Sequence, residues 1–424
     1  MHGKRKLGVV LATGLVAGNM IGSGIFLLPA TLASVGGVAL IGWLFAAFGA
    51  LVLALLFGRL ADRHPLAGGP ASYVFADVGP FAGFQATICY WAACLIGNVA
   101  IATAAAGYLG ALVPGLTGAA IPLAAIALLW LLALANFVSP RFVGQLDGLL
   151  LIAGLVPLLL IATAGWLAFD VDLFRDSWNP GGASVAATIP SALVLVFWAF
   201  TGLESACVAA AVVDDPRRNV PIATLAGVAF AALVYISAST VMTGLVPADQ
   251  LAASSAPFAL AAARTLGESA GPVIAAFALL KALGTLAGWV LLTAQVSQAA
   301  AERGLLPAAF ARVRSGDTPA LGLVAAGVIG TLAIALTVSP TLGEQFGILI
   351  EASTLFALLT YAGACVGALL RGERSDVALA VIGGAFCVVV IAGSSRSALA
   401  ATAVAIVAAA LAWPLVRARA TRSS

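Results

Sequence analysis

Apolar runs of about 20 residues follow one another along almost the whole sequence, with short polar linkers between them. A helix needs about 20 such residues to cross the hydrocarbon core of a bilayer. Charged residues make up only 9% of the chain, against roughly 25% in soluble proteins. The sequence therefore predicts an all-α polytopic membrane protein that forms a single transmembrane domain over 1–424. The twelve candidate spans are 7–31, 36–59, 81–110, 118–138, 145–169, 188–212, 221–246, 271–299, 319–338, 345–369, 377–394 and 398–416.

Lysine and arginine are divided unequally between the two sets of linkers. With a cytoplasmic N-terminus, 16 of the 20 basic residues fall on the cytoplasmic side and three on the other, and Lys281 lies inside a span. Positively charged loops remain preferentially on the cytoplasmic side of a membrane. We therefore expect both termini in the cytoplasm and an even number of spans. The first apolar run is expected to be a retained helix, because no small-residue cleavage site follows it.

Two spans carry helix-breaking residues beside polar groups. The first contains the run Gly22-Ser23-Gly24, and the sixth contains Gly202 and Glu204. Interrupted helices at matching places in two halves of a chain indicate the substrate site of an inverted-repeat transporter. The alternative is that these glycines only allow helices to pack closely. The pairing of two such breaks favours a five-plus-five inverted repeat with broken helices 1 and 6. The first repeat would cover 7–169 and the second 188–369, and 377–416 would form two additional helices.

Each break frees backbone groups that lipid cannot satisfy. Unwinding at Gly22, Ser23 and Gly24 would leave N–H groups at the start of a half-helix, where partial positive charge favours an anion. The break in the sixth span would expose carbonyls near Trp198 and Thr201, which can accept hydrogen bonds from an ammonium group. An α-amino acid carries both charges and fits this pair of helix ends.

Other polar and aromatic side chains inside the spans predict that the cavity also receives a cation. Trp289 lies too deep in its span for an interfacial position, and an aromatic face inside a cavity attracts a cation. Cys94 and Asn98 are four residues apart and share one helix face. An asparagine side chain and helix carbonyls suit a guanidinium or ammonium group. The other candidates are Tyr90 in the third span and Ser353 and Tyr361 in the tenth.

Three ionisable residues, Glu204, Lys281 and Glu351, fall inside predicted spans. Such residues are functional candidates by default, because an isolated charge in the membrane is unfavourable. Lys281 and Glu351 lie at similar depths in spans of the same direction, which predicts a structural ion pair. The competing interpretation is that Lys281 has no such partner and takes part in coupling.

The cysteine and histidine contents offer no metal centre or disulfide framework. The five cysteines are odd in number, lie inside apolar spans and include no CxxC motif. The two histidines, His2 and His64, fall near the predicted cytoplasmic side. We therefore expect no metal site and no cofactor.

Several stretches carry a family resemblance. They are GLVAGNMIGSGIFLLPATLASVGG, CYWAACLIGNVAI, DSWNP, FWAFTGLESACVAAAVVDDPRRNVPIAT and LGTLAGWVLLTAQ. Together they resemble the basic amino acid/polyamine antiporters of the amino acid–polyamine–organocation (APC) superfamily, most of all the members that exchange arginine for agmatine. The resemblance runs from about residue 7 to about residue 369, and beyond that only hydropathy matches.

The resemblance implies twelve spans, obligatory exchange without a metal ion, and a homodimer whose interface involves the last two helices. It also implies that Ser23 and Gly24 hold the substrate carboxylate. The α-ammonium group would meet carbonyls near Met20, Trp198 and Thr201. Asn19 matches the asparagine of the first helix break.

For the cationic end of the substrate, the resemblance implies stacking of a guanidinium group on Trp289. Further contacts would come from Ala93, Cys94, Asn98 and Ser353. The gating residues would be Tyr90, Glu204 and Tyr361. The sequence departs from the relatives' pattern at Thr201, Lys281 and Glu351.

These observations predict an antiporter that exchanges a cationic amino acid, arginine, for its decarboxylated amine, agmatine, across the inner membrane by alternating access. The alternative is a uniporter or a proton-coupled symporter or exchanger for neutral amino acids or polyamines, with Lys281 as a fixed or titrating cation. A membrane enzyme or receptor is a third class, but the sequence shows no nucleophile–base pair for catalysis. No nucleic-acid partner is expected.

Overall fold

The structure is a computed structural model that describes residues 7–22, 24–64, 69–139, 150, 154–208, 213–314, 318–372 and 374–420. Within these ranges the regular secondary structure is helical. The α-helices are α1 (Val9–Met20), α2 (Gly24–Thr31), α3 (Ala39–Arg63), α4 (Pro70–Asp77), α5 (Pro80–Leu112), α6 (Ala120–Val138), α8 (Val171–Asp176), α9 (Val185–Phe197), α10 (Ser205–Val208), α11 (Pro216–Leu245), α12 (Ala248–Ala253), α13 (Pro257–Leu266), α14 (Ala270–Glu302), α15 (Ala320–Leu336), α16 (Leu342–Arg371), α17 (Arg374–Ala392) and α18 (Arg396–Ala420). The 3-10 helices are η1 (Gly36–Val38), η2 (Ala164–Ala168), η3 (Trp198–Phe200) and η5 (Ala308–Ala311).

Most of the predicted spans correspond to apolar helices. Among the described residues, eight helical segments are long and apolar enough to cross a membrane: Val9–Thr31, Gly36–Arg63, Pro80–Leu112, Ala120–Val138, Pro216–Leu245, Ala270–Glu302, Leu342–Arg371 and Arg396–Arg417. Four shorter apolar helices are Gly154–Ala168, Val185–Phe200, Ala320–Leu336 and Asp376–Ala392. The prediction of an all-α polytopic membrane protein is confirmed. The first part of the fifth predicted span and the end of the sixth lie outside the described residues.

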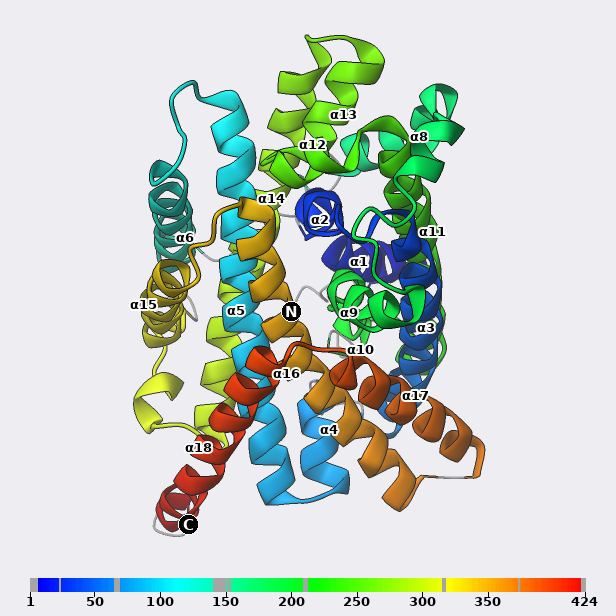
Figure 1. The fold of residues 1–424 in the computed structure, drawn as a ribbon. Helices are drawn as coiled ribbons and strands as arrows, with labels where there is room; N and C mark the ends of the chain where they lie inside the picture. The colour runs from blue at the N-terminus through cyan, green and yellow to red at the C-terminus, as the bar shows by residue number, and fades with distance from the viewer. Residues whose placement is uncertain are drawn as a thin grey trace.

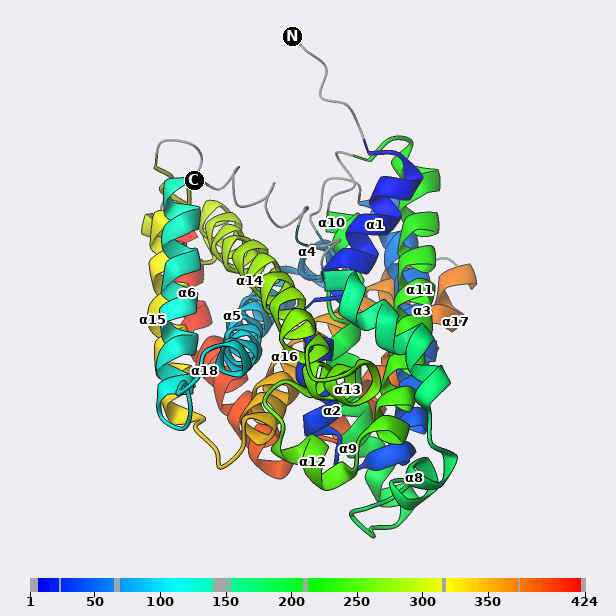
Figure 2. The ribbon, with the colours of Figure 1, turned by 90° about the horizontal axis from the view of Figure 1, so that it is seen from above.

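The short helices next to the breaks lie inside the bundle. In Figures 1 and 2, α5, α6 and α15 lie on one side of the molecule and α3 and α11 on the other, with α1, α2, α9 and α10 between them. Helix α5 packs along both α14 and α16, and α11 packs along both α1 and α3. Irregular backbone at membrane depth is tolerated only where protein or a cavity surrounds it. This position therefore allows α1 and α9 to end in the middle of apolar sequence.

Glycines bring α11 close to the two helices on either side of it. A Cβ atom added to Gly227 of α11 would lie 2.7 Å from the Cβ of Val16 on α1. A Cβ atom added to Gly58 of α3 would lie 3.2 Å from the Cα of Pro221 on α11. Small residues of this kind let membrane helices approach backbone to backbone. They hold the first helix break against a continuous helix.

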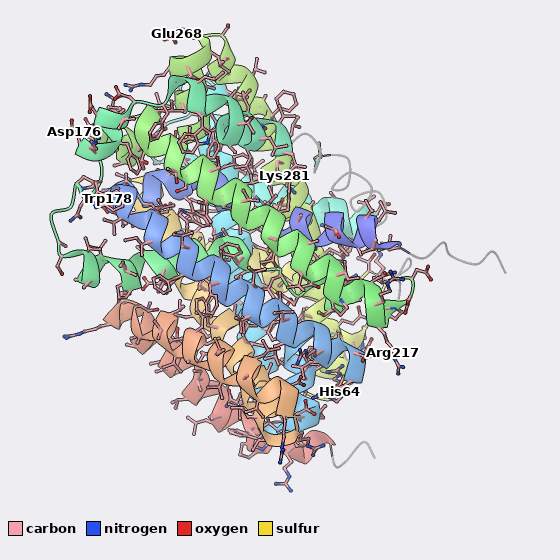
Figure 3. The ribbon with its side chains drawn as sticks, turned by 90° about the vertical axis from the view of Figure 1, so that its right-hand side faces the viewer. His64, Asp176, Trp178, Arg217, Glu268 and Lys281 are labelled. Carbon is pink, nitrogen blue, oxygen red and sulfur yellow. The ribbon has the colours of Figure 1, made fainter. Side chains whose placement is uncertain are left out.

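The two ends of the bundle differ in their charged groups. Figure 3 shows His64 and Arg217 at one end and Asp176, Trp178 and Glu268 at the opposite end. The first end carries basic residues that the sequence places on the cytoplasmic side. Its ion pairs join Arg59 to Asp376 at 2.9 Å, Arg217 to Asp62 at 3.1 Å, and Arg63 to Asp376.

Candidate functional site

The first helix break lies between Met20, the last residue of α1, and Gly24, the first residue of α2. The N–H of Gly22 donates to the carbonyl of Met20 at 2.6 Å, a tight turn that interrupts the helical pattern. Ser23 lies outside the described residues. The helix therefore stops inside an apolar span, beside the glycines that the sequence singles out.

The second break follows α9 and consists of η3 and the residues before α10. Both the N–H and the Oγ1 of Thr201 donate to the carbonyl of Trp198, at 3.0 and 2.6 Å. Gly202 has a φ of +96°, a backbone conformation that glycine adopts without steric penalty. In this structure the Trp198 carbonyl, a predicted acceptor for an ammonium group, is already occupied by Thr201.

The two breaks lie against each other. A Cβ atom at Gly202 would lie 3.5 Å from the carbonyl carbon and oxygen of Asn19, near the end of α1. Gly24, at the start of α2, lies so close to the indole of Trp198 that any Cβ atom there would overlap the ring. The glycines thus bring unwound backbone from distant parts of the sequence to one place.

Trp198 and Trp289 form an aromatic wall beside the two breaks. Their ring centroids are 6.1 Å apart and the ring planes are inclined by 49°. Gly97 on α5 leaves space for both rings, because a Cβ atom there would lie 2.9 Å from Trp198 and 3.4 Å from Trp289. The same Cβ atom would lie 3.5 Å from the Oγ of Ser353 on α16. Side chains from η3, α14 and α16 therefore converge on one glycine of α5.

Two cavities adjoin this aromatic wall, which we name the site cavity and the vestibule. The site cavity has a volume of ≈ 20 Å³, room for about one water molecule. The vestibule has a volume of ≈ 190 Å³. Asn19, Met20, Gly22, Gly24, Ile101, Trp198, Ala199, Thr201, Thr285 and Trp289 line the site cavity. Leu15, Asn19, Tyr90, Gly202, Glu204, Ser205, Trp289 and Leu292 line the vestibule.

Glu204 joins three parts of the bundle at the vestibule. The hydroxyl of Tyr90 on α5 donates to its Oε1 at 2.9 Å, and the hydroxyl of Tyr361 on α16 donates to its Oε2 at 2.7 Å. Glu204 is only 3% exposed. Tyr73 approaches this group from α4, and burial, followed by nearby Cys207 and Glu204, raises the pKa of its phenol. The three residues implied as gates thus form one hydrogen-bonded cluster.

Apart from Trp289, the residues implied for the cationic end of a substrate are not among those that line the site cavity or the vestibule. Ser353 donates to the carbonyl of Ala93 at 2.8 Å. The Nδ2 of Asn98 donates to the Oγ1 of Thr293 at 2.8 Å, whereas its buried Oδ1 has no hydrogen-bond partner within the described ranges. Cys94 is buried. The structure brings this set together. The Ala93 carbonyl already accepts from Ser353, so the Oδ1 of Asn98 is the acceptor that is left for a substrate cation.

Three residues that line the site cavity were not singled out from the sequence: Ile101, Ala199 and Thr285. Thr285 precedes Trp289 by four residues, and this spacing places both on one face of a helix. Applied to Trp289, that rule would have identified Thr285. Ile101 and Ala199 are ordinary apolar residues in apolar spans, and nothing in the sequence distinguishes them.

The predicted ion pair between Lys281 and Glu351 is wrong. The Nζ of Lys281, a residue 1% exposed, donates to the carbonyl of Gly18 on α1 at 3.4 Å. Glu351 instead accepts hydrogen bonds from the N–H and the Oγ of Ser395, at 2.5 and 3.0 Å. Residues at similar depth in two spans are not necessarily neighbours. Here α14, which carries Lys281, and α16, which carries Glu351, each pack along α5. Figure 3 shows Lys281 between the two ends of the bundle.

Because Lys281 and Glu351 have different partners, their substitutions should act independently. Lys281→Met removes a buried donor to Gly18 and should lower the free energy of unfolding by roughly 1–3 kcal/mol. Glu351→Gln should cause a smaller loss, and the double variant should show their sum within about 0.5 kcal/mol. Denaturant unfolding of the purified variants in detergent measures all three values. If the double variant instead regained most of the unfolding free energy that Lys281→Met loses, the result would support the ion pair after all.

Discontinuous helices that meet inside a polytopic bundle, beside a small cavity, are the arrangement of a secondary transporter site. A family model described as amino acid permease matches residues 7–423. The cadaverine/lysine antiporter of Escherichia coli (strain K12) is 38% identical over 415 residues, which cover 95% of this chain and 93% of that protein. The putrescine transporter PotE of the same strain is 38% identical over 360 residues, 84% of this chain and 81% of that protein. PotE of Haemophilus influenzae is 36% identical over 373 residues, 87% of this chain and 86% of that protein.

The chain therefore belongs to the amino acid permease family. The resemblance to the basic amino acid/polyamine antiporters of the APC superfamily is confirmed. The protein is a membrane-embedded, multi-pass transporter of small molecules.

Proposed function

We propose that this chain is an antiporter that exchanges a basic amino acid for its decarboxylated amine by alternating access across the inner membrane. The observation that carries the proposal is the meeting of two helix breaks at a cavity with a Trp198–Trp289 wall. Helix ends recognise the charges on the α-carbon of an amino acid, and an aromatic wall recognises a cation. The names of the three relatives described above, which concern lysine, cadaverine and putrescine, support this class of substrate.

The amino-acid end of the substrate belongs at the two breaks. The N-terminus of α2 at Gly24 offers N–H groups and partial positive charge to the carboxylate, and the family resemblance adds Ser23 to this site. The carbonyls of Met20 and Trp198 would accept from the α-ammonium group once Gly22 and Thr201 release them. A decarboxylated amine lacks the carboxylate and uses only the other contacts.

The cationic end belongs at Trp289 and Asn98, which gives arginine and agmatine as the first candidate pair. A planar guanidinium group stacks well on an aromatic face and presents several donors. Asn98 supplies an unused acceptor for one of them. Lysine and cadaverine are the second candidate pair, supported by the 38% identity to the cadaverine/lysine antiporter.

Transport requires the site cavity to enlarge, because ≈ 20 Å³ cannot hold an amino acid. Separation of Trp198 from Trp289 would join this cavity to the vestibule, where Tyr90, Glu204 and Tyr361 act as the gate. With both termini in the cytoplasm, the vestibule lies on the cytoplasmic side of the site. This movement suits a twelve-span, five-plus-five inverted repeat in which the broken helices 1 and 6 shift against the rest. The helices of 377–416 would then serve a homodimer interface.

A proton-coupled symporter or a uniporter is the alternative, and the position of Lys281 favours it. Its ammonium group contacts the carbonyl of Gly18 on the broken helix α1. A cation at that position would couple its own charge state to the position of α1.

Counterflow in proteoliposomes tests the proposal. Radiolabelled arginine uptake should be fast into vesicles preloaded with arginine or agmatine and close to background into vesicles preloaded with buffer alone. Preloading with lysine, cadaverine or putrescine identifies the pair. Equal uptake into loaded and empty vesicles would overturn antiport in favour of the uniporter or symporter.

Ser23 should matter for the amino acid more than for the amine. Ser23→Ala removes a hydroxyl donor to the carboxylate and should raise the Kd for the amino acid roughly tenfold. The Kd for the amine should change less than about twofold, because no carboxylate is present to lose the bond. Isothermal titration of the two ligands compares the effects directly. Equal losses for both ligands would assign the serine to folding or to the ammonium end.

A further inference from the structure

Thr285 presents a buried hydroxyl that no group in the described ranges satisfies. It lines the site cavity from α14 and is 4% exposed. Its Oγ1 has no hydrogen-bond partner there. A buried hydroxyl without a partner is unfavourable by about 1–3 kcal/mol, so an unsatisfied group at a cavity calls for an explanation.

Thr285 differs in this respect from another threonine on the same helix. Threonines inside helices usually donate to the carbonyl four residues earlier. Thr293 does so, with its Oγ1 2.8 Å from the carbonyl oxygen of Trp289. The hydroxyl of Thr285 makes no such bond. It is therefore available to a ligand.

The side chain of Thr285 faces the first helix break. A Cβ atom added to Gly22 would lie 3.1 Å from the Cγ2 of Thr285. Trp289 lies one helical turn further along α14, a rise of about 6 Å. Along this face of the helix, Thr285 is beside the unwound backbone and Trp289 forms part of the aromatic wall.

We propose that the hydroxyl of Thr285 donates a hydrogen bond to the substrate carboxylate and makes Thr285 a specificity-determining residue that favours the amino acid over its amine. The inference rests on the proposed function, which places the carboxylate beside Gly22 and Gly24. A hydroxyl donating to a carboxylate forms a charge-assisted hydrogen bond, stronger than one between neutral groups. The amine has no group at this position, so its binding gains nothing from Thr285.

The test compares variants that remove the hydroxyl with one that keeps it. Thr285→Val removes the donor at nearly constant volume, Thr285→Ala removes it without adding a methyl group, and Thr285→Ser retains it. Thr354→Val is the matched control, because Thr354 on α16 also has a buried Oγ1 without a partner in the described ranges and is not among the residues that line the two cavities. Kd values for arginine, agmatine, lysine and cadaverine are measured by isothermal titration in detergent, with ligand-free melting temperatures as the check on folding.

We expect Thr285→Val and Thr285→Ala to raise the Kd of the amino acids roughly tenfold, a change of about 1.4 kcal/mol. The Kd of the amines should stay within about twofold, and Thr285→Ser and Thr354→Val should resemble the wild type. Equal changes for amino acids and amines, or none for either, would overturn the role of Thr285. A wild-type protein that binds none of the four ligands would instead overturn the proposed function, so the two failures are distinguishable.

Discussion

Replacing Trp289 with leucine is expected to raise the Kd for arginine by roughly 10- to 30-fold while the protein remains folded. The desolvated face of a tryptophan contributes up to about 2 kcal/mol to the binding of a cation, and each 1.4 kcal/mol corresponds to about a tenfold change in affinity. Leucine retains apolar contact with Trp198 but offers no π-face. Because the amino acid and the amine of the proposed exchange carry the same cationic end, the amine should lose affinity by a similar factor.

Trp130 provides the control for this experiment. It lies on α6, donates its indole N–H to Thr331 on α15 at 3.0 Å, and packs on Gly327. Trp130→Leu therefore removes a tryptophan from the bundle without changing the residues that line the site cavity. We expect it to alter the melting temperature but not the Kd. An unchanged arginine Kd in Trp289→Leu would remove Trp289 from the binding site.

The helix breaks could be predicted from the sequence because their signal is local. A run of Gly22, Ser23 and Gly24 inside an apolar span is unfavourable for a helix by about 1 kcal/mol per glycine, and Gly202 beside Glu204 repeats the pattern. The structure ends α1 at Met20, two residues before Gly22, and ends η3 at Phe200, two residues before Gly202. Hydropathy likewise predicted the helices, because a membrane span depends on a property that neighbouring residues share.

Contacts between distant spans could not be predicted in the same way. Depth alone suggested that Lys281 and Glu351 meet, but the order of helices around the bundle decides which spans touch, and hydropathy carries no information on that order. Trp198 was expected to supply a carbonyl, whereas its ring also forms half of the aromatic wall. This ring packs against Trp289 on α14 and over Gly24 and Gly97, and such contacts between distant spans follow from tertiary packing rather than from local sequence.

The second large effect is expected at Glu204. Glu204→Leu leaves the hydroxyls of Tyr90 and Tyr361 without their shared acceptor. A buried hydroxyl left without a partner is unfavourable by about 1–3 kcal/mol. Tyr361 is fully buried and should cause a loss of this size in the free energy of unfolding, and Tyr90, which is part-buried at the vestibule, should add less. Glu204→Gln keeps one oxygen that accepts from a tyrosine hydroxyl, and its amide N–H can donate to the oxygen of the other tyrosine. The free energy of unfolding should therefore fall far less in this variant. Denaturant unfolding in detergent measures both variants.

Adding Tyr90→Phe and Tyr361→Phe to Glu204→Leu separates the stability of this cluster from its function. Removing every polar partner together is nearly neutral, so the triple variant should regain most of the lost stability. If the Glu204 carboxylate makes the proposed exchange depend on pH, the triple variant and Glu204→Gln should both show a flatter pH profile of arginine exchange than the wild type. The comparison works because Glu204→Gln preserves the size and most hydrogen bonds of the side chain while it removes the carboxylate. Superimposable pH profiles for Glu204→Gln and the wild type would leave the carboxylate with a packing role only, as the shared acceptor that ties α5 and α16 to the second helix break.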